Sequence, residues 1–487
     1  MAAPREYLTS PRHPGRPRDP RDPCHAYPTR PTRPTRPTGP PGRPPIARRL
    51  AAAVAAAGLL AGGCASYHPL PLPTHSTLTR PAAGALAPLD MDQVATLAVL
   101  NNPDLNTARS ELGVARAQAF AAGLLPDPQF TYNPDHPDDH VTPADPFHRY
   151  PEFNEYNLEL DADLLALVTH PDSRAAARGD SQQAQLDLLW QEWQTVAEAR
   201  TLYVQQWIGA QRRDFLASAR RVYALAAQRS QQAQTAGNVT LEQSSADLAV
   251  LQDVSSRLGD AERSLASAQQ GLRSLLGVQP DVSLPLQPLT EPLIPSRSAV
   301  QSAVAQLPQH RPDLRALQAG YRAQEARVRL AILSQFPDVT IGLTKTRDNG
   351  DVHAIGGLAT LTLPLFNRGR GGVAIQRATR AQLRADYQAR LDQAVGSAWQ
   401  LWSETRQLQR QLADLQAQLP RLARSVQQAE RAYRAAEFPA ASYLTLVGSY
   451  LAAQELEATL RESLWSDSIA LATVLGTQVQ PGAAGRS

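Results

Sequence analysis

Three carboxylates alternate with apolar side chains over residues 156–164, a spacing that gives an extended strand one charged face. Glu159, Asp161 and Asp163 share one side, because successive side chains in a strand point to opposite faces. The other side is apolar and carries Tyr156, Leu158, Leu160, Ala162 and Leu164. If that side meets lipid, the carboxylates line a wet lumen and favour cations. A sheet half-buried on a soluble core has the same period, and acids in a lumen can also be simple polar lining.

Residues 133–153 hold a second group of side chains that could do chemistry. Carboxylates and imidazoles this close together have the donor atoms of a divalent metal site: His136, Asp138, Asp139, His140, Asp145 and His148. The same segment holds five prolines, and charged clusters in loops are usually solvated. We therefore interpret it as a surface loop and predict no metal site.

The sequence lacks the motifs of the common catalytic sites. It has no Gly-rich phosphate loop, and its only lysine is Lys345, which argues against nucleotide hydrolysis. A Ser/His/Asp set and a zinc-binding helix motif are also missing, so a periplasmic hydrolase is not supported. We predict a protein that is not an enzyme and that needs no cofactor.

The first 64 residues are expected to be a leader. Residues 1–46 are rich in proline and arginine and should be disordered. Arg48 and Arg49 then precede a short apolar run, and Gly62 and Gly63 lead into Cys64. A charged start, a short apolar core and small residues before a cysteine are typical of a lipoprotein signal. We predict that Cys64 is lipidated; an ordinary signal with an incidental cysteine is the alternative.

The leader also distorts the net charge. Residues 1–64 contain 11 arginines and 3 acids, a charge of +8, whereas the whole chain carries +3. The remainder is therefore at −5, which does not indicate a nucleic-acid binder. The only other cysteine, Cys24, lies in the leader, so the mature chain can form no internal disulfide.

The rest of the chain contains an internal duplication. Asn-Pro-Asp-Leu at 102–105 recurs as Arg-Pro-Asp-Leu at 311–314, and Leu-Gly pairs at 276–277 and 475–476 close the two copies. We predict a linker over 65–88, a first repeat over 89–279, a linker over 280–296, a second repeat over 297–477 and a tail over 478–487. Each repeat should contain a helix, a β-hairpin (129–165 and 338–365) and a long helical hairpin (174–277 and 371–477).

The second repeat carries a long heptad seam. From Ala398 to Ala436, mostly apolar residues step alternately by three and four positions over more than five heptads. A helix from about 371 to 436 would be roughly 100 Å long, which suits a tube better than a globular domain. Pro420 lies in this seam and should kink the helix. A plain intramolecular coiled coil would show the same periodicity.

The ordered set formed by residues 102–105, 363–371 and 475–476 resembles the TolC-like outer-membrane factor family, over about residues 88–478. The resemblance implies an α+β membrane protein, internally duplicated, with four transmembrane β-strands that contribute to a trimeric twelve-stranded barrel. Long coiled-coil helices would form a periplasmic α-barrel beneath it. The implied location is the bacterial outer membrane, with a lipid anchor at Cys64 and helices in the periplasm.

The resemblance also assigns two structural sites. One is the strand-to-helix turn, where glycine permits the turn and Asn367 can cap it: Pro364, Phe366, Asn367, Gly369 and Gly371. The other is the periplasmic tip: Gly237, Asn238, Val239, Phe438, Pro439 and Tyr443. The paired aspartates that close the tip in some members have no counterpart in 441–445. Phe438, Tyr443 and Leu444 form either an apolar constriction there or ordinary packing between helices.

These features predict an outer-membrane channel subunit of a tripartite efflux pump. The implied partners are two further copies of the chain, outer-membrane lipid, a periplasmic adaptor and an inner-membrane pump of the resistance-nodulation-division type, which would deliver drugs or metal ions. Within the channel class, the outlet of a type I polypeptide secretion system is the alternative. From another class, a periplasmic coiled-coil adaptor lipoprotein is the alternative, although it would have one helical hairpin rather than two copies of strand pair and hairpin.

Overall fold

A computed structural model describes residues 67–80, 87–135, 154–348, 350–435 and 437–477. The chain divides into two units, Met1–Thr74 and His75–Ser487, and the description below concerns the second. Cys64 and the histidine- and aspartate-rich positions 136–148 lie outside the described residues, so their predicted roles stay predictions.

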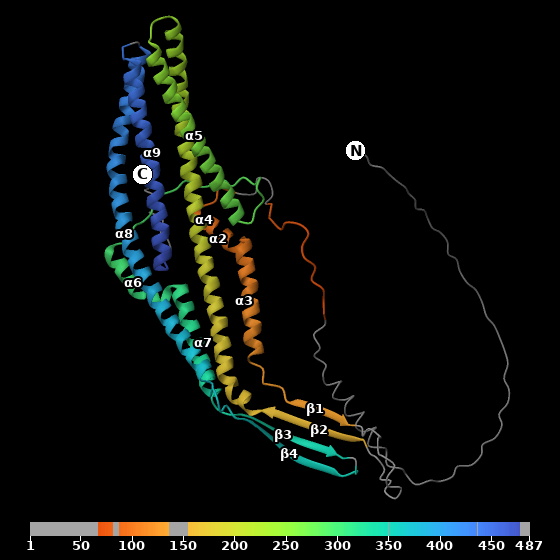
Figure 1. The fold of residues 1–487 in the computed structure, drawn as a ribbon. Coiled ribbons are helices and arrows are strands. Elements are labelled where there is room, and N and C mark those ends of the chain that lie inside the picture. The colour runs from red at the N-terminus through yellow and green to blue at the C-terminus, as the bar shows by residue number, and fades with distance from the viewer. Residues whose placement is uncertain (1–66, 81–86, 136–153, 349, 436, 478–487) are drawn as a thin grey trace, which may run out of the picture. The chain divides into compact units, whose positions relative to one another are not determined.

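The second unit contains one order of elements twice, as the predicted duplication requires (Figure 1). In each copy, two short helices lead to a pair of strands, and a very long helix then pairs with a second long helix. The first copy comprises α2 (Met91–Asn101), α3 (Pro103–Ala121), β1 (Gln129–Asp135), β2 (Glu155–Asp163), α4 (Leu164–Thr235) and α5 (Leu241–Leu275). The second comprises α6 (Arg297–His310), α7 (Pro312–Leu333), β3 (Asp338–Arg347), β4 (His353–Thr362), α8 (Arg370–Arg434) and α9 (Ala440–Leu475).

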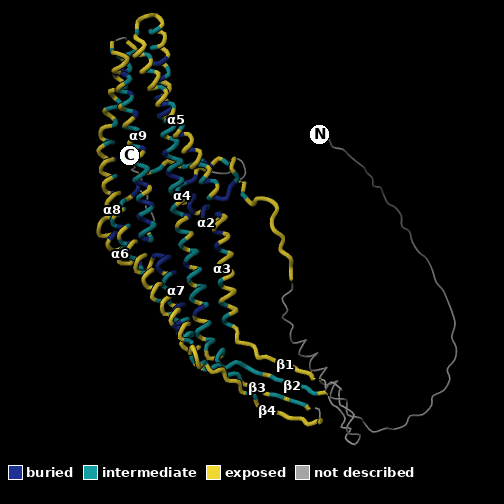
Figure 2. Tube along the Cα trace, in the orientation of Figure 1, coloured by how far each residue is buried: buried dark blue, intermediate teal, exposed yellow. Residues whose placement is uncertain are grey.

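The long helices have the predicted length. α4 has 72 residues and α8 has 65, which correspond to roughly 110 and 100 Å at 1.5 Å per residue. Every described member of the heptad seam from Ala398 to Tyr433 is buried or half-buried, and the solvent side of α8 is exposed (Figure 2). Pro420 lies inside α8, which continues as a helix on both sides of it. The seam therefore packs α8 against its neighbours as the period predicts.

The first long helix begins ten residues earlier than the predicted start at 174. The Asp163 side chain accepts a hydrogen bond from the Ala166 amide at 2.9 Å, so it caps the helix at the last residue of β2. Leu164 is consequently the first residue of α4 and does not extend the apolar face of the strand. β4 likewise ends at Thr362, before the predicted boundary at 365. Capping decides where β2 gives way to α4, and side-chain alternation alone does not reveal it.

The repeated motif at 102–105 and 311–314 docks onto the Leu-Gly motif that closes each copy. In the first copy, the Asn102 amide donates to the Leu275 carbonyl at 3.2 Å, and its side-chain oxygen accepts from the Leu105 amide. In the second, Arg311 donates to the Val474 carbonyl at 3.4 Å. Each motif thus ties the start of a short helix to the end of a long hairpin, which explains why the two motifs recur together.

Arg311 also forms a buried ion pair. Its guanidinium donates to both carboxylate oxygens of Asp313 at 2.7 and 3.0 Å, and the two side chains are only 7% and 9% exposed. The guanidinium also lies 4.9 Å from the ring centre of Trp190. A buried, bidentate pair of this kind holds its geometry tightly, but each charge depends on the other.

We expect Arg311→Met to destabilise the protein by about 3–5 kcal/mol, because it leaves the Asp313 carboxylate buried without its main partner. The double variant Arg311→Met/Asp313→Leu should recover most of the loss, since no unpaired charge remains. Thermal melting in detergent measures both. Arg434→Met, which removes an exposed ion pair with Glu430, serves as a control and should melt close to the wild type. A double variant as unstable as Arg311→Met would contradict this account.

Candidate functional site

The four strands form one antiparallel sheet in the order β1-β2-β3-β4. Directly paired residues of an antiparallel sheet lie on the same face, so the register extends the alternation of β2 across the whole sheet. Glu159 pairs with Thr131 and Thr344, and Asp161 pairs with Gln129 and Gly342. The face that carries the three predicted acids therefore also carries Asn133, Asn157, Asp338, Thr340, Thr346, Thr360 and Thr362. We call it the polar face.

The opposite face of the sheet is apolar and uncovered within one chain. It carries Phe130, Tyr132, Leu158, Leu160, Ala162, Val339, Ile341, Leu343, Ile355, Ala359 and Leu361. Phe130 is 67% exposed, Leu343 66% and Ile355 80%. A continuous exposed apolar sheet face is unfavourable in water, so this face requires lipid or a protein partner.

Both edges of the sheet lack a strand partner among the described residues. β1 and β4 are these edges, and they run in opposite directions because the sheet has four antiparallel strands. The β4 edge of one chain can therefore pair in antiparallel fashion with the β1 edge of another. Along the strands, Lys345 and Arg347 lie on the apolar face near the 348–352 turn, where Arg347 contacts Asp351 at 2.8 Å.

The strand-to-helix turn after β4 has a glycine where the backbone needs one. Gly369 is the N-cap of α8 with a φ of 65°, in the left-handed region that glycine tolerates best. Asn367 does not cap the helix; its side-chain oxygen instead accepts from the Gly369 amide at 3.1 Å and closes the turn before it. Gly371 lies in the first turn of α8, and Phe366, two residues after Pro364, is fully exposed. The turn is thus closed by the Asn367 side chain, and two successive residues, Arg368 and Gly369, take the left-handed conformation.

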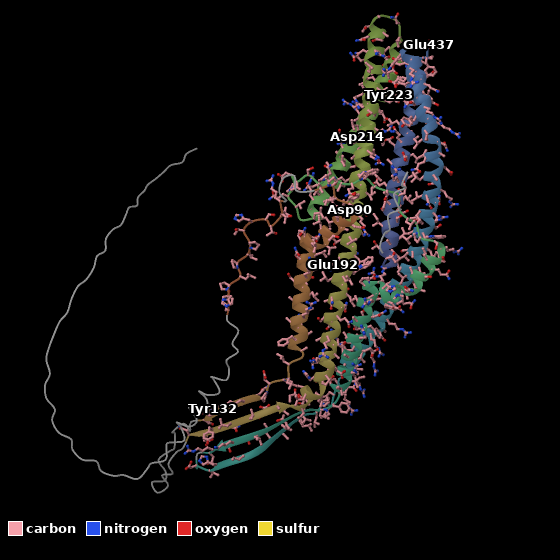
Figure 3. All side chains as sticks on the ribbon, turned by 180° about the vertical axis from the view of Figure 1, so that it is seen from behind. Asp90, Tyr132, Glu192, Asp214, Tyr223 and Glu437 are labelled. Carbon is pink, nitrogen blue, oxygen red and sulfur yellow. The ribbon has the colours of Figure 1, made fainter. Side chains whose placement is uncertain are left out.

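The predicted tip residues lie at the two turns between the long helices, at the end of the unit opposite the sheet, as the labelled Glu437 and Tyr132 show (Figure 3). Gly237 has a φ of 78°, and the Asn238 amide donates to the Ala233 carbonyl at 2.8 Å, which ends α4. Pro439 is the N-cap of α9. Val239 and Phe438 are half-buried. The two turns are therefore built differently, one on glycine and one on proline.

Tyr443 is buried within one chain and does not project into open space. Its ring stacks on that of Tyr433, with the centres 5.2 Å apart and the planes at 12°. Phe438 and Leu444 pack against the same buried cluster. In a single chain the three residues thus pack between helices, the second of the two interpretations of the sequence. Burial, with a nearby Glu430, raises the pKa of the Tyr443 phenol.

Two hydrogen bonds near the tip join the helical hairpins, and the sequence did not point to them. The Tyr223 hydroxyl in α4 donates to the Leu444 carbonyl in α9 at 3.1 Å (Figure 3). Arg229 in α4 donates to the Tyr433 hydroxyl in α8 at 3.2 Å. Tyr433 occupies a position of the heptad seam, where the spacing predicts only apolar packing. The sequence therefore gives no sign that its hydroxyl accepts a hydrogen bond.

Among the described residues, no group of three or more His, Cys, Asp or Glu side chains is arranged to hold a metal ion. No helix in the described part of the chain is long and apolar enough to cross a membrane.

Residues 303–477 match the outer membrane efflux protein family. The matched segment spans 175 of the 487 residues and lies within the predicted second repeat. The family consists of channels rather than enzymes. A search of curated proteins finds no match to the sequence.

Solved outer-membrane channel structures share the fold of this chain. CusC is 18% identical and aligns over 85% of this chain and 99% of its own, with a TM-score of 0.65. VceC of Vibrio cholerae is 18% identical over 80% of this chain and 96% of its own, with a TM-score of 0.64. CmeC of Campylobacter jejuni is 16% identical over 80% of this chain and 86% of its own, with a TM-score of 0.67. The predicted fold class of strand sheet and long helices is confirmed.

We expect Tyr443→Phe to leave the melting temperature of the protein unchanged at neutral pH, because the ring stack on Tyr433 remains. Tyr443→Ala should destabilise it by about 3–5 kcal/mol through loss of a buried ring. The raised pKa adds a pH signature: the stability that the neutral phenol provides is complete below its unfolded pKa of about 10 and is lost as the pH rises through the folded pKa. Wild type and Tyr443→Phe should therefore diverge only above about pH 10. Equal melting of Tyr443→Ala and wild type would contradict the packing role.

Proposed function

We propose that this protein is the outer-membrane exit duct of a tripartite efflux pump, open to small solutes such as drugs or metal ions. The observation that carries the proposal is the sheet: one face is polar and acidic, the other is apolar and exposed, and neither edge has a strand partner in the described part of the chain. A β-structure in lipid must close on itself, because unpaired backbone groups have no water to bind. The long helices continue from this sheet as a conduit.

The four-stranded sheet can close into a barrel only with strands from other copies of the same chain. Four strands are too few to close a barrel, and the smallest membrane barrels have eight. The antiparallel directions of the β1 and β4 edges allow identical copies to join edge to edge. Three copies give twelve strands, the number that the family resemblance implies. The polar face would then surround a water-filled lumen and the apolar face would meet lipid.

The end of the long helices that lies opposite the sheet is the expected site for partner proteins. A passive duct needs another protein to supply energy and cargo, and the helix turn at Glu437 lies at the end opposite the sheet (Figure 3). We propose that a periplasmic adaptor and an inner-membrane pump, of the resistance-nodulation-division type, engage that end. The duplicated strand pair and hairpin favour this role over that of an adaptor lipoprotein with a single hairpin.

The acids of the polar face supply the test of function. Glu159, Asp161 and Asp163 from three copies would place nine carboxylates around one lumen, and their field should attract cations. Changing Glu159→Gln, Asp161→Asn and Asp163→Asn together should lower the cation-over-anion selectivity in a planar bilayer, most clearly at low salt, where screening is weak.

The matched control changes neutral residues of the same face: Thr131→Asn, Thr344→Asn and Thr360→Asn. This triple variant should conduct with wild-type selectivity. Unchanged selectivity in the variant that lacks these three acids would show that the three carboxylates line the lumen without selecting ions. A wild-type protein that forms no conducting unit at all would contradict the channel proposal itself.

We further propose that Cys64 carries the lipid anchor, on the strength of the charged, apolar and small-residue order that precedes it. Mass spectrometry of the mature N-terminus should find a diacylglyceryl Cys64, and Cys64→Ser should abolish labelling with a palmitate analogue. Cys24→Ser is the control and should label like the wild type. A mature protein that begins at another residue and carries no lipid would refute the anchor.

A further inference from the structure

The two repeats of one chain meet along α4 and α7, and the contact is unusually close. A Cβ added at Gly179 of α4 would lie 2.7 Å from the Cβ of Ala323 in α7. One turn further along α4, Gln183 lies against Gly320. Leu186 then forms a buried cluster with Ala316 and Ala319. The contacts run in opposite directions along the two helices, so α4 and α7 pack antiparallel through small residues.

The duplication gives each of these residues a counterpart. Asn102 and Arg311, which stand before α3 and α7, are 209 positions apart. The N-caps Thr240 and Pro439 are 199 apart, and this offset also holds inside the long helices. Tyr203 of α4 and Trp402 of α8, again 199 apart, each donate to a linker carbonyl, at 2.7 and 2.9 Å. α3 is thus the counterpart of α7, and α8 that of α4.

The counterpart faces are uncovered within one chain. On α7, Ala316, Ala319, Ala323 and Ala326 are at most 1% exposed. Their counterparts on α3 are all exposed: Thr107, Ser110, Val114 and Ala117. On the long helices, Ala176 of α4 is 6% exposed, whereas its counterpart Ile375 of α8 is 63% exposed. The surface that joins the repeats inside a chain therefore has an open copy on α3 and another on α8.

We infer that α8 of a second copy of this chain packs along α3 of the first, in the register that α4 has on α7. The offset of 199 takes Gly179 and Gln183 of α4 to Ala378 and Gln382 of α8, and the offset of 209 takes Ala323 and Gly320 of α7 to Val114 and Glu111 of α3. Ala378 of one copy should therefore meet Val114 of the other, and Gln382 should meet Glu111. This inference rests on the proposed channel assembly from identical copies, and it specifies which residues of the copies meet.

The contact between copies differs in chemistry from its template inside the chain. Across α4 and α7, Arg327 pairs with Asp180, and Arg329 contacts Asp172 at 2.7 Å. The corresponding pairs across α8 and α3 are Gln118 with Thr379 and Phe120 with Gly371. Both ion pairs are replaced by neutral or apolar residues, so the contact between copies should be less sensitive to salt than the contact within a chain.

The contact between copies is also bulkier. Valine and alanine stand at 114 and 378, where alanine and glycine meet within the chain. The extra atoms keep α3 and α8 further apart than α7 and α4, because a Cβ at Gly179 already has no room. The ring of helices should therefore alternate between closer and wider spacings instead of repeating evenly around the axis.

Disulfide trapping in membranes tests the register. The two test pairs are Val114→Cys/Ala378→Cys and Glu111→Cys/Gln382→Cys, each made in a chain that also carries Cys24→Ser. Each single-cysteine variant shows whether its new cysteine forms a disulfide with the native Cys64. A disulfide needs Cα atoms within about 7 Å. The matched control is Val114→Cys/Ala385→Cys, which moves one cysteine by two helical turns, about 10 Å. Oxidation should convert most of the monomer band of the two test pairs into covalent dimers and trimers, and should leave the control pair and the single variants monomeric on the gel.

The outcomes separate the register from the channel proposal. Cross-linking of the control pair, with none in the test pairs, would overturn the register and leave the assembly of copies standing. An absence of cross-links from variants that still run as native oligomers would do the same. Variants and wild type that are all monomeric in detergent would overturn the inference together with the proposed function. All four test positions are exposed in one chain, so wild-type melting of the single variants verifies their folding.

Discussion

The constraint on which this structure depends is that backbone N–H and C=O groups cannot stay unpaired in hydrocarbon. The sheet presents an apolar face suited to lipid, yet neither of its edges is paired with another strand within the described ranges. An edge strand in water can be protected by charge or by water, but in lipid it must find another strand. On the proposed function, the four strands close with further copies of the chain, and a barrel closed in this way would place the acids of β2 inside.

The helices obey a related constraint of symmetry. Identical copies around an axis can form a continuous wall only if both sides of each copy fit its neighbours. The duplicated sequence meets this requirement, because each repeat presents the same order of helices. Within a chain, α4 and α7 show how two repeats fit. The exposed face of α3 corresponds to the face of α7 that is buried against α4, and the exposed face of α8 corresponds to the face of α4 that is buried against α7. Sheet closure and helix packing therefore both require the same partner, a second copy.

Much of this architecture could be predicted from the sequence, because its signals are periodic. The steps of three and four from Ala398 predicted a helix about as long as α8. The period of two around Glu159 predicted the two faces of β2. The recurrence of the motif at 102–105 predicted the duplication. Each of these depends on local spacing along one element, which a sequence displays directly.

What the sequence could not supply depends on contacts between distant residues or on local hydrogen bonds. The Asp163 cap sets the start of α4 at Leu164. Leu164 is apolar and so extends the alternating pattern of β2 in the sequence, although it belongs to the helix. The polar face of four strands needs the register of β1 with β2 and of β2 with β3. Arg311 does not cap its helix as Asn102 does, but both side chains donate to a carbonyl at the end of a long hairpin. The charge of Arg311 is matched by Asp313 two residues later.

The central claim is that the folded unit of this protein in a membrane is an assembly of three copies. Native mass spectrometry of the protein extracted in a mild detergent tests it most directly, because the copy number is read from the mass. The account predicts a single dominant species with three times the mass of the mature chain, which loses its fold when it is separated into monomers. A folded monomer that is stable in detergent would contradict the account.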